Sequence, residues 1–190
     1  MIDVFLRFAP ATPLRMHLAS AVLCRWLEEA EANIHCLFMR GTYPQELFPG
    51  LCEVELLEAD FCWTTRNYAE ERAAGEYYIL ADDDHLILGE HWVERAVRGI
   101  REGYGILAAR SVISPERFEN LDNLYVGCPA IIRKGAVDYH LLEGSPNQQD
   151  GIICAAMRKN GFQTGFIAGL DYNHLGFGFS QVEPLLWGRY

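Results

Sequence analysis

Three consecutive carboxylates follow directly after an unbroken apolar run in the stretch YYILADDD, Tyr77–Asp84. A run that is apolar at every position is typical of a strand covered on both faces in the middle of a parallel sheet. In an open parallel sheet, ligands bind outside the carboxyl ends of the strands. Asp82, Asp83 and Asp84 are expected at that place, which raises the question of the ligand that they bind.

The simplest explanation for these aspartates is a turn followed by a helix N-cap, because Asp is favoured at both. One aspartate would be enough for that purpose. Three adjacent carboxylates raise one another's cost of ionisation, and a divalent cation such as Mn²⁺ or Mg²⁺ would offset the repulsion. A hard cation held by one or two carboxylates completes its shell with water and substrate phosphates. The stretch therefore predicts a metal site for a phosphate-bearing ligand.

The composition predicts one globular domain over residues 1–190. Hydrophobic residues make up 50% and charged residues 22% of the chain, which is ordinary globular usage. The formal net charge of -10 argues against non-specific binding to nucleic acid or to an anionic membrane. An anionic ligand would therefore need a local binding device.

Other features of the sequence predict a cytoplasmic protein. No apolar stretch approaches the roughly 20 residues that a membrane span requires, and residues 1–21 contain charges and prolines where a secretory signal would be apolar. The six cysteines are scattered without a CxxC pair. We interpret them as reduced thiols that contribute to packing.

Apolar periodicity predicts strands that alternate with helices as far as residue 110. The expected strands are 2–8, 33–39, 52–58, 77–81 and 104–109, and the expected helices are 12–32, 64–75 and 92–103. This order predicts right-handed crossovers and a doubly wound α/β layer. In the second half, 124–137 is strand-like with a bend, a helix is expected from Ser145 to Gly161, and a last strand over 162–169.

The stretch TTRNYAEERAAGEYYILADDD resembles glycosyltransferase family 2 and its relatives with the GT-A fold. In those proteins an Arg-Asn pair opens a helix, an Ala-x-Gly closes it, and a strand ends in an Asp-x-Asp motif. Arg66, Asn67, Gly75, Asp82 and Asp84 fall on those places. Downstream, CPAIIRKGAVDY resembles the strand before the acceptor side, and QQDGIICAAMRKNG resembles the family's Glu-Asp helix.

The resemblance covers nearly the whole chain and implies a fold and an activity. The implied fold is a single GT-A-like α/β domain with a mostly parallel central sheet flanked by helices. Residues 1–110 would bind the nucleotide sugar, and residues 111–190 would face the acceptor. The implied activity is a hexosyltransferase-type glycosyltransferase that depends on Mn or Mg and uses a nucleotide sugar, with a UDP-sugar as the expected donor.

By the same resemblance, Asp150 is the catalytic base, Asp84 is a metal ligand, and Asp82 contacts the metal or the donor ribose. His174 stands where several relatives place a further metal ligand. The implied donor-binding residues are Arg7, Phe8, Ala9, Arg40, Arg66, Asn67, Asp82 and Asp83. The implied acceptor-side residues are Tyr125, Gly127, Pro129, Asp138 and Gln149.

The chemistry of these residue types agrees with the implied roles. A metal clamp stabilises the charge that develops on a leaving diphosphate without any proton transfer. A carboxylate such as Asp150 can take the proton from an acceptor hydroxyl, which is otherwise a poor nucleophile. A base opposite the leaving group implies inversion at the anomeric carbon. The acceptor stays open among a saccharide, a lipid-linked sugar, a protein side chain and a modified nucleic-acid base.

Each role also has a simpler explanation. Asp150 falls in the first turn of its expected helix, where the helix dipole alone favours an acid. His174 could be a packing or loop histidine, and Arg66 could be a solvated helix residue. The chain also departs from the family, because Gln149 replaces a glutamate, Ala156 replaces an arginine, and MRGTYPQ stands where relatives have acidic residues that read the base. The identity of the donor base therefore stays open.

Two other functions compete with the glycosyltransferase hypothesis. A sugar-nucleotide pyrophosphorylase should have a glycine-rich phosphate loop after the first strand, and RFAPATPLR has no glycine. A non-catalytic binding module could have kept the fold, with the aromatic tail FGFSQVEPLLWGRY as a partner-binding segment. Substitution of Asp150 would separate an enzyme from a scaffold.

Overall fold

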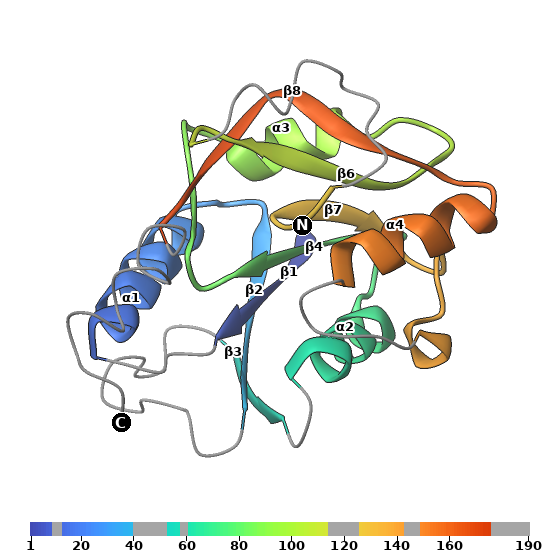
Figure 1. Cartoon of the computed structure of the whole chain (residues 1–190). Helices are drawn as coiled ribbons and strands as arrows, with labels where there is room; N and C mark the ends of the chain where they lie inside the picture. Colours follow the sequence, from blue (N-terminus) through green and yellow to red (C-terminus); the bar gives the residue numbers. More distant parts are fainter. Residues whose placement is uncertain (9–12, 40–52, 58–60, 114–125, 143–148, 176–190) are drawn as a thin grey trace.

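The structure is a computed structural model that describes residues 1–8, 13–39, 53–57, 61–113, 126–142 and 149–175. The strands are β1 Ile2–Phe8, β2 Ala32–Met39, β3 Glu53–Leu57, β4 Tyr77–Asp82, β5 His85–Ile87, β6 Tyr104–Ser111, β7 Ala130–Arg133 and β8 Gln163–His174. The helices are α1 Pro13–Leu27, α2 Phe61–Arg72, α3 Trp92–Arg98 and α4 Gln149–Lys159, with a short 3-10 helix η2 at Tyr139–Leu141. The strands form one sheet in the order β3-β2-β1-β4-β7-β6-β8-β5 (Figure 1).

The first half of the sheet confirms the expected doubly wound arrangement. Strands β3, β2, β1 and β4 are neighbours, and every pair among them is parallel. Residues along β1 and β4 are apolar at almost every position because both faces of these strands are covered. Val4, Leu6 and Phe8 point into one apolar cluster, whereas Phe5 points into the other.

The second half of the sheet mixes directions in a way that the sequence did not predict. Strand β7 lies between β4 and β6 and is antiparallel to both. Strand β6 is parallel to β8, and β5 pairs with β8 in the antiparallel direction at the edge of the sheet. The three-residue strand β5 was not predicted from the sequence, since it is too short to show a period of two.

Helices cover both faces of the sheet. Helices α1 and α3 contribute to the cluster that contains Val4 and Leu6, and α2 and α4 contribute to the cluster on the other face (Figure 1). The rings of Trp26 in α1 and Trp92 in α3 meet edge to face with centroids 5.2 Å apart. The result is a three-layer α/β/α domain with two apolar cores.

Helix boundaries differ from the expected ones by a few residues. Helix α1 ends at Leu27, and α2 begins at Phe61 instead of Thr64. Helix α3 ends at Arg98, although Gly103 was expected to end it. Gly99 is the C-cap, and a Cβ at this position would overlap the side chain of Ile167. The glycine therefore lets the end of α3 pack closely against Ile167 in β8.

Two further expectations concerned the cysteines and the apolar segments of the chain. Cys36, Cys128 and Cys154 are free and buried, as expected of packing thiols, whereas Cys24 is free and exposed. Among the helices that the structure describes, none has the length and apolar composition needed to cross a membrane.

Glu29 joins the end of α1 to the start of α3. Its carboxylate accepts a hydrogen bond from the backbone N–H of Val93 at 2.9 Å and contacts Nη2 of Arg25 at 2.7 Å. The N-cap residue of α3, His91, makes no side-chain capping hydrogen bond. The buried carboxylate of Glu29 therefore serves one of the backbone donors at the start of α3.

Replacing this buried acceptor should destabilise the domain. We expect Glu29→Ala to lower the free energy of unfolding by about 1–3 kcal/mol, because the Val93 N–H loses its acceptor and Arg25 loses a counter-ion. Urea unfolding followed by circular dichroism measures the change. The matched control is Glu28→Ala, which removes an exposed glutamate 3.4 Å from the same arginine. Equal stability of the two variants would contradict the capping role.

Candidate active site

The carboxyl ends of β1 and β4 lie side by side and bring Arg7 to Asp82. The two residues are register partners, and Nε and Nη2 of Arg7 lie 2.6 Å and 2.5 Å from Oδ1 of Asp82. The Arg7 side chain is only 7% exposed. Its Nη2 also contacts Sγ of Cys128 at 3.8 Å. Arg7 therefore fixes the position of Asp82, the first aspartate of the triplet.

Asp83 and Asp84 have a second arginine in common. The backbone N–H of the buried Asp83 donates to the carbonyl of Arg7 at 3.0 Å. The Asp83 carboxylate lies 2.9 Å from Nη2 of Arg15, which is also 3.5 Å from Oδ2 of Asp84. Arg15 lies in the first turn of α1. Sequence reasoning missed Arg15, because no spacing in the chain connects residue 15 with residues 83 and 84.

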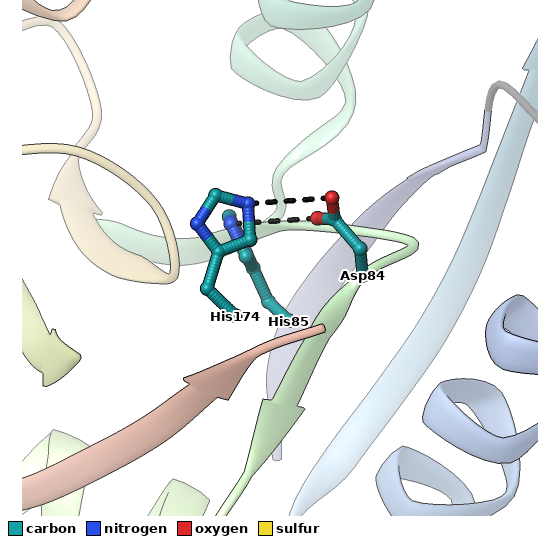
Figure 2. A group of neighbouring side chains, drawn as sticks. All are labelled: Asp84, His85 and His174. Carbon is teal, nitrogen blue, oxygen red and sulfur yellow. Dashed lines mark ion pairs between the residues drawn. The ribbon is translucent and has the colours of Figure 1, made fainter. Parts of the chain in front are cut away.

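Asp84, His85 and His174 form a compact cluster of possible metal ligands (Figure 2). One ligand atom from each residue lies within 4.8 Å of the others. The pairing of β5 with β8 sets His85 opposite His174, and the N–H of Leu175 donates to the carbonyl of Asp84 at 2.8 Å. Nε2 of His174 lies 3.3 Å from Oδ2 of Asp84, and Nε2 of His85 lies 3.6 Å from Oδ1.

Burial and the neighbouring charges shift the pKa values of this cluster in opposite directions. Burial alone would raise the pKa of Asp84, but the hydrogen bond from His174 and the charges of His85, His174 and Arg15 lower it to about 2. Burial would lower the pKa of His174, but the hydrogen bond and charge of Asp84 outweigh burial and raise it. Burial lowers the pKa of His85, despite the nearby carboxylates of Asp82 and Asp84. The lowered pKa favours the neutral form of His85, and the raised pKa favours the protonated form of His174.

The tautomer of His85 distinguishes it from the other two residues. The backbone N–H of Asp82 donates to Nδ1 of His85 at 3.2 Å. A neutral ring that accepts at Nδ1 carries its proton on Nε2, the nitrogen that faces Asp84, and a protonated nitrogen cannot bind a metal. With this tautomer, Asp84 and His174 would be the ligand pair for a metal, and His85 would support Asp84. A carboxylate oxygen and an imidazole nitrogen fit a divalent cation such as Mn²⁺.

Asp150 lies in the first turn of α4. Arg66 donates a hydrogen bond to one of its carboxylate oxygens, and Gly127 packs against the other. Oδ1 accepts a hydrogen bond from Nη2 of Arg66 at 3.1 Å. Oδ2 packs against the α-carbon of Gly127, where a Cβ would overlap the carboxylate. The Asp150 side chain is 34% exposed. The carboxylate is therefore fixed in position and still accessible to a ligand.

Arg66 is a buried cation between the two groups of carboxylates. Burial opposes its charge, but the surroundings formed by Cys128, Asp150, Tyr139 and Asp82 raise its pKa above the ordinary value. Its Nε is buried and has no hydrogen-bond partner in the part of the chain that the structure describes. Arg66 was expected near the start of its helix, but α2 begins at Phe61, so Arg66 lies in the second turn.

Two ion pairs, one side-chain contact and one electrostatic interaction relate Asp82 to Asp150. Arg7 pairs with Asp82 and contacts Cys128, Cys128 lies in the surroundings of Arg66, and Arg66 pairs with Asp150. The aspartate triplet and the expected base are thus brought into one region, although they are 66 or more positions apart in the sequence.

The remaining expected residues fall in different places. Phe8 is fully buried in the core, where its ring stacks on Phe38 with centroids 4.7 Å apart. Asn67 and Asp138 line one surface pocket of about 270 Å³, and Asp138 also accepts from the N–H of His140. Pro129 and Gln149 are both buried. In the sequence, Pro129 follows Cys128 and Gln149 precedes Asp150. Ala9, Arg40 and Tyr125 lie outside the described residues.

Comparison in sequence gives no relative, because no protein family and no curated protein matches the chain. Comparison in structure does. The structure of S. aureus TarS 1-349 in complex with UDP-GlcNAc matches with a TM-score of 0.64 and 14% identity, over 97% of this chain and 64% of that one. A mannosyltransferase from Pyrobaculum calidifontis in complex with GDP-Man and Mn2+ matches with a TM-score of 0.66 and 12% identity, over 91% and 56%.

The chain thus spans less than two thirds of the length of both structures. At these identities the likeness is one of fold. It confirms the fold expected from the Arg-Asn and Asp-x-Asp patterns, and the chain has a GT-A-like glycosyltransferase fold.

The contact between Gly127 and Asp150 can be tested by a double-mutant cycle. We expect Gly127→Ala to destabilise the protein by about 1–3 kcal/mol, because the new methyl group overlaps Oδ2 of Asp150. In an Asp150→Ala background the same change should cost much less. Urea unfolding measures both. Gly75→Ala is the control, since a Cβ there meets its nearest atom at 3.4 Å, an ordinary contact. Equal costs in the two backgrounds would contradict the contact.

The pair of His174 and Asp84 should make stability depend on pH. A raised pKa of His174 in the folded state means that its contribution is complete below the ordinary value of 6.5 and is lost as the pH rises through the folded value. The lowered pKa of Asp84 means that its contribution is present above 3.8 and is lost as the pH falls toward about 2. The pair therefore stabilises the metal-free protein most in mildly acidic solution.

Thermal unfolding in buffer with a chelator measures this effect. We expect the wild type to exceed His174→Gln in stability by more at about pH 5.5 than at about pH 9. His140→Gln is the control, because His140 is an exposed histidine that faces Glu71 away from the cluster. A difference between wild type and His174→Gln that does not change with pH would show that the pair carries no charge.

Proposed function

We propose that the protein is a metal-dependent glycosyltransferase that moves a sugar from a nucleoside diphosphate to an acceptor hydroxyl, with a UDP-sugar as the first donor to test. One observation carries the proposal. A possible metal cluster of Asp84, His85 and His174 follows β4, and interactions through Arg7, Cys128 and Arg66 relate the neighbouring Asp82 to the accessible carboxylate of Asp150. The neighbours that bind UDP-GlcNAc, or GDP-Man and Mn2+, support the choice of donor class.

On the donor side, Asp84 and His174 would hold the divalent cation, and the bound cation would neutralise charge on the leaving diphosphate. Asp82 is held by Arg7, and its side chain is 27% exposed, so it can also accept hydrogen bonds from a ligand. Its position beside the cluster suits contact with the donor ribose. The arginines around the triplet offset the acidic net charge locally and so favour an anionic donor.

On the acceptor side, Asp150 would act as the general base. It takes the proton of the acceptor hydroxyl while the hydroxyl oxygen bonds to the anomeric carbon. The bond from that carbon to the diphosphate breaks in the same step, and its electron pair leaves with the nucleoside diphosphate. Attack from the side opposite the leaving group inverts the anomeric carbon. The ion pair with Arg66 keeps the carboxylate oriented for this transfer.

Donor binding and turnover can be separated by experiment. Calorimetric titration with UDP, GDP and their sugars, with and without MnCl₂, measures donor binding, and hydrolysis of the bound donor measures turnover without a known acceptor. We expect Asp150→Asn to lower hydrolysis by about 100-fold or more while the donor affinity changes by less than about twofold. Asp84→Ala should abolish Mn-dependent binding.

The matched control for the base is Asp171→Asn. Asp171 has the same 34% side-chain exposure and pairs with an arginine at 3.2 Å, close to the 3.1 Å of Asp150. Equal hydrolysis by the two Asn variants would reject Asp150 as the base. A folded wild type that binds no donor under any condition would reject the transferase and favour a non-catalytic binding module with this fold.

A further inference from the structure

Arg15 contacts the oxygen atom through which Asp84 would bind a metal. Nη2 of Arg15 lies 3.5 Å from Oδ2 of Asp84 and 2.9 Å from Oδ1 of Asp83. The same Oδ2 of Asp84 lies 3.3 Å from Nε2 of His174. An internal cation therefore stands at the Asp84 oxygen that faces His174.

A metal ion and Arg15 would repel each other at this place. A divalent cation lies about 2 Å from a carboxylate oxygen, so it would come within about 6 Å of the guanidinium in its present position. Asp84 is largely buried, and screening by water and salt is weak for partly buried charges. The charge of Arg15 therefore lowers the affinity of Asp84 for a metal unless the side chain moves away.

Of the two arginines at the triplet, Arg15 is the more exposed. Arg7 is 7% exposed and directs both Nε and Nη2 to Asp82 at short distances. Arg15 is 28% exposed, and it lies closer to Asp83, at 2.9 Å, than to Asp84, at 3.5 Å, so its contact with Asp84 is the weaker of the two. A guanidinium forms paired hydrogen bonds with phosphate oxygens, so a diphosphate offers it a new counter-ion.

We propose that Arg15 is an exchangeable counter-ion, which neutralises Asp83 and Asp84 in the free protein and transfers to the donor diphosphate when metal and nucleotide bind together. The proposal rests on the proposed function, because it requires a nucleoside diphosphate as ligand. It adds a control of binding order. Metal alone binds weakly, and metal with nucleotide binds well, because the diphosphate draws the competing cation off Asp84.

Two titrations test the two halves of this exchange. The first follows MnCl₂ alone, through the electron paramagnetic resonance signal of free Mn²⁺. We expect Arg15→Gln to bind Mn²⁺ about tenfold more tightly than the wild type, because the competing charge is gone. The second follows UDP at saturating MnCl₂ by calorimetry. There we expect Arg15→Gln to bind about tenfold more weakly, because the diphosphate has lost its arginine.

The matched control is Arg133→Gln, which removes the same charge from the opposite end of β4. Arg133 is 31% exposed and lies 2.9 Å from Glu76, the residue before β4, so its own exposure and its ion-pair distance match those of Arg15. It should stay within about twofold of the wild type in both titrations, because a distant exposed charge is screened. Arg15→Lys should keep the weak Mn²⁺ binding but lose UDP affinity, since lysine has the charge without the planar fork.

The outcomes separate this proposal from the proposed function. If Arg15→Gln binds Mn²⁺ no more tightly than Arg133→Gln, the competition is wrong. If Mn²⁺ binds more tightly but UDP affinity is unchanged, the transfer to the diphosphate is wrong. If the wild type binds Mn²⁺ but never UDP, the proposed function and the transfer fail together, and the Mn²⁺ titration still decides the competition. Arg15→Met gives the same tests if the Gln variant does not fold.

Discussion

The ion pair between Arg7 and Asp82 ties together the ends of two neighbouring strands, and the arrangement of the site depends on it. Two nitrogens of one arginine meet a single carboxylate oxygen, and the cation is almost completely buried. Breaking such a pair would leave a desolvated charge without a counter-ion, which is strongly unfavourable. The pair therefore fixes the point at which β4 ends. The N–H of Asp83 donates to the carbonyl of Arg7, and the carbonyl of Asp84 accepts from the N–H of Leu175.

On both sides of the Arg7–Asp82 pair, further carboxylates lie next to positive or titratable groups. On one side Arg15 and His174 face Asp83 and Asp84, and on the other side Cys128 and Arg66 lead to Asp150. Each described carboxylate of the site thus has a positive or titratable neighbour, although the chain as a whole carries a formal charge of -10. These neighbours favour the ionised form of the carboxylates in a partly buried site.

The sequence predicted those parts of the fold and the site that depend on local patterns. Strand β4 and the position of the triplet follow from an apolar run and the residues next to it, and α4 with Asp150 follows from helical spacing. The insertion of β7 between β4 and β6 depends on packing between distant segments, so no local pattern contains it. The same reason hides Arg15 and His85. Arg15 acts through a contact across 68 positions, and the role of His85 depends on the hydrogen bond that fixes its tautomer.

The short strand β5 has a consequence for how the cluster is held together. His85 begins this three-residue strand at the edge of the sheet, and His174 ends the strand that pairs with it. Short edge segments open locally at a smaller free-energy cost than the whole domain. Fraying of this edge would therefore separate Asp84 and His85 from His174 while the central strands stay intact. A ligand that binds both Asp84 and His174 would hold β5 against β8, and the amide protons of β5 would then exchange more slowly with solvent.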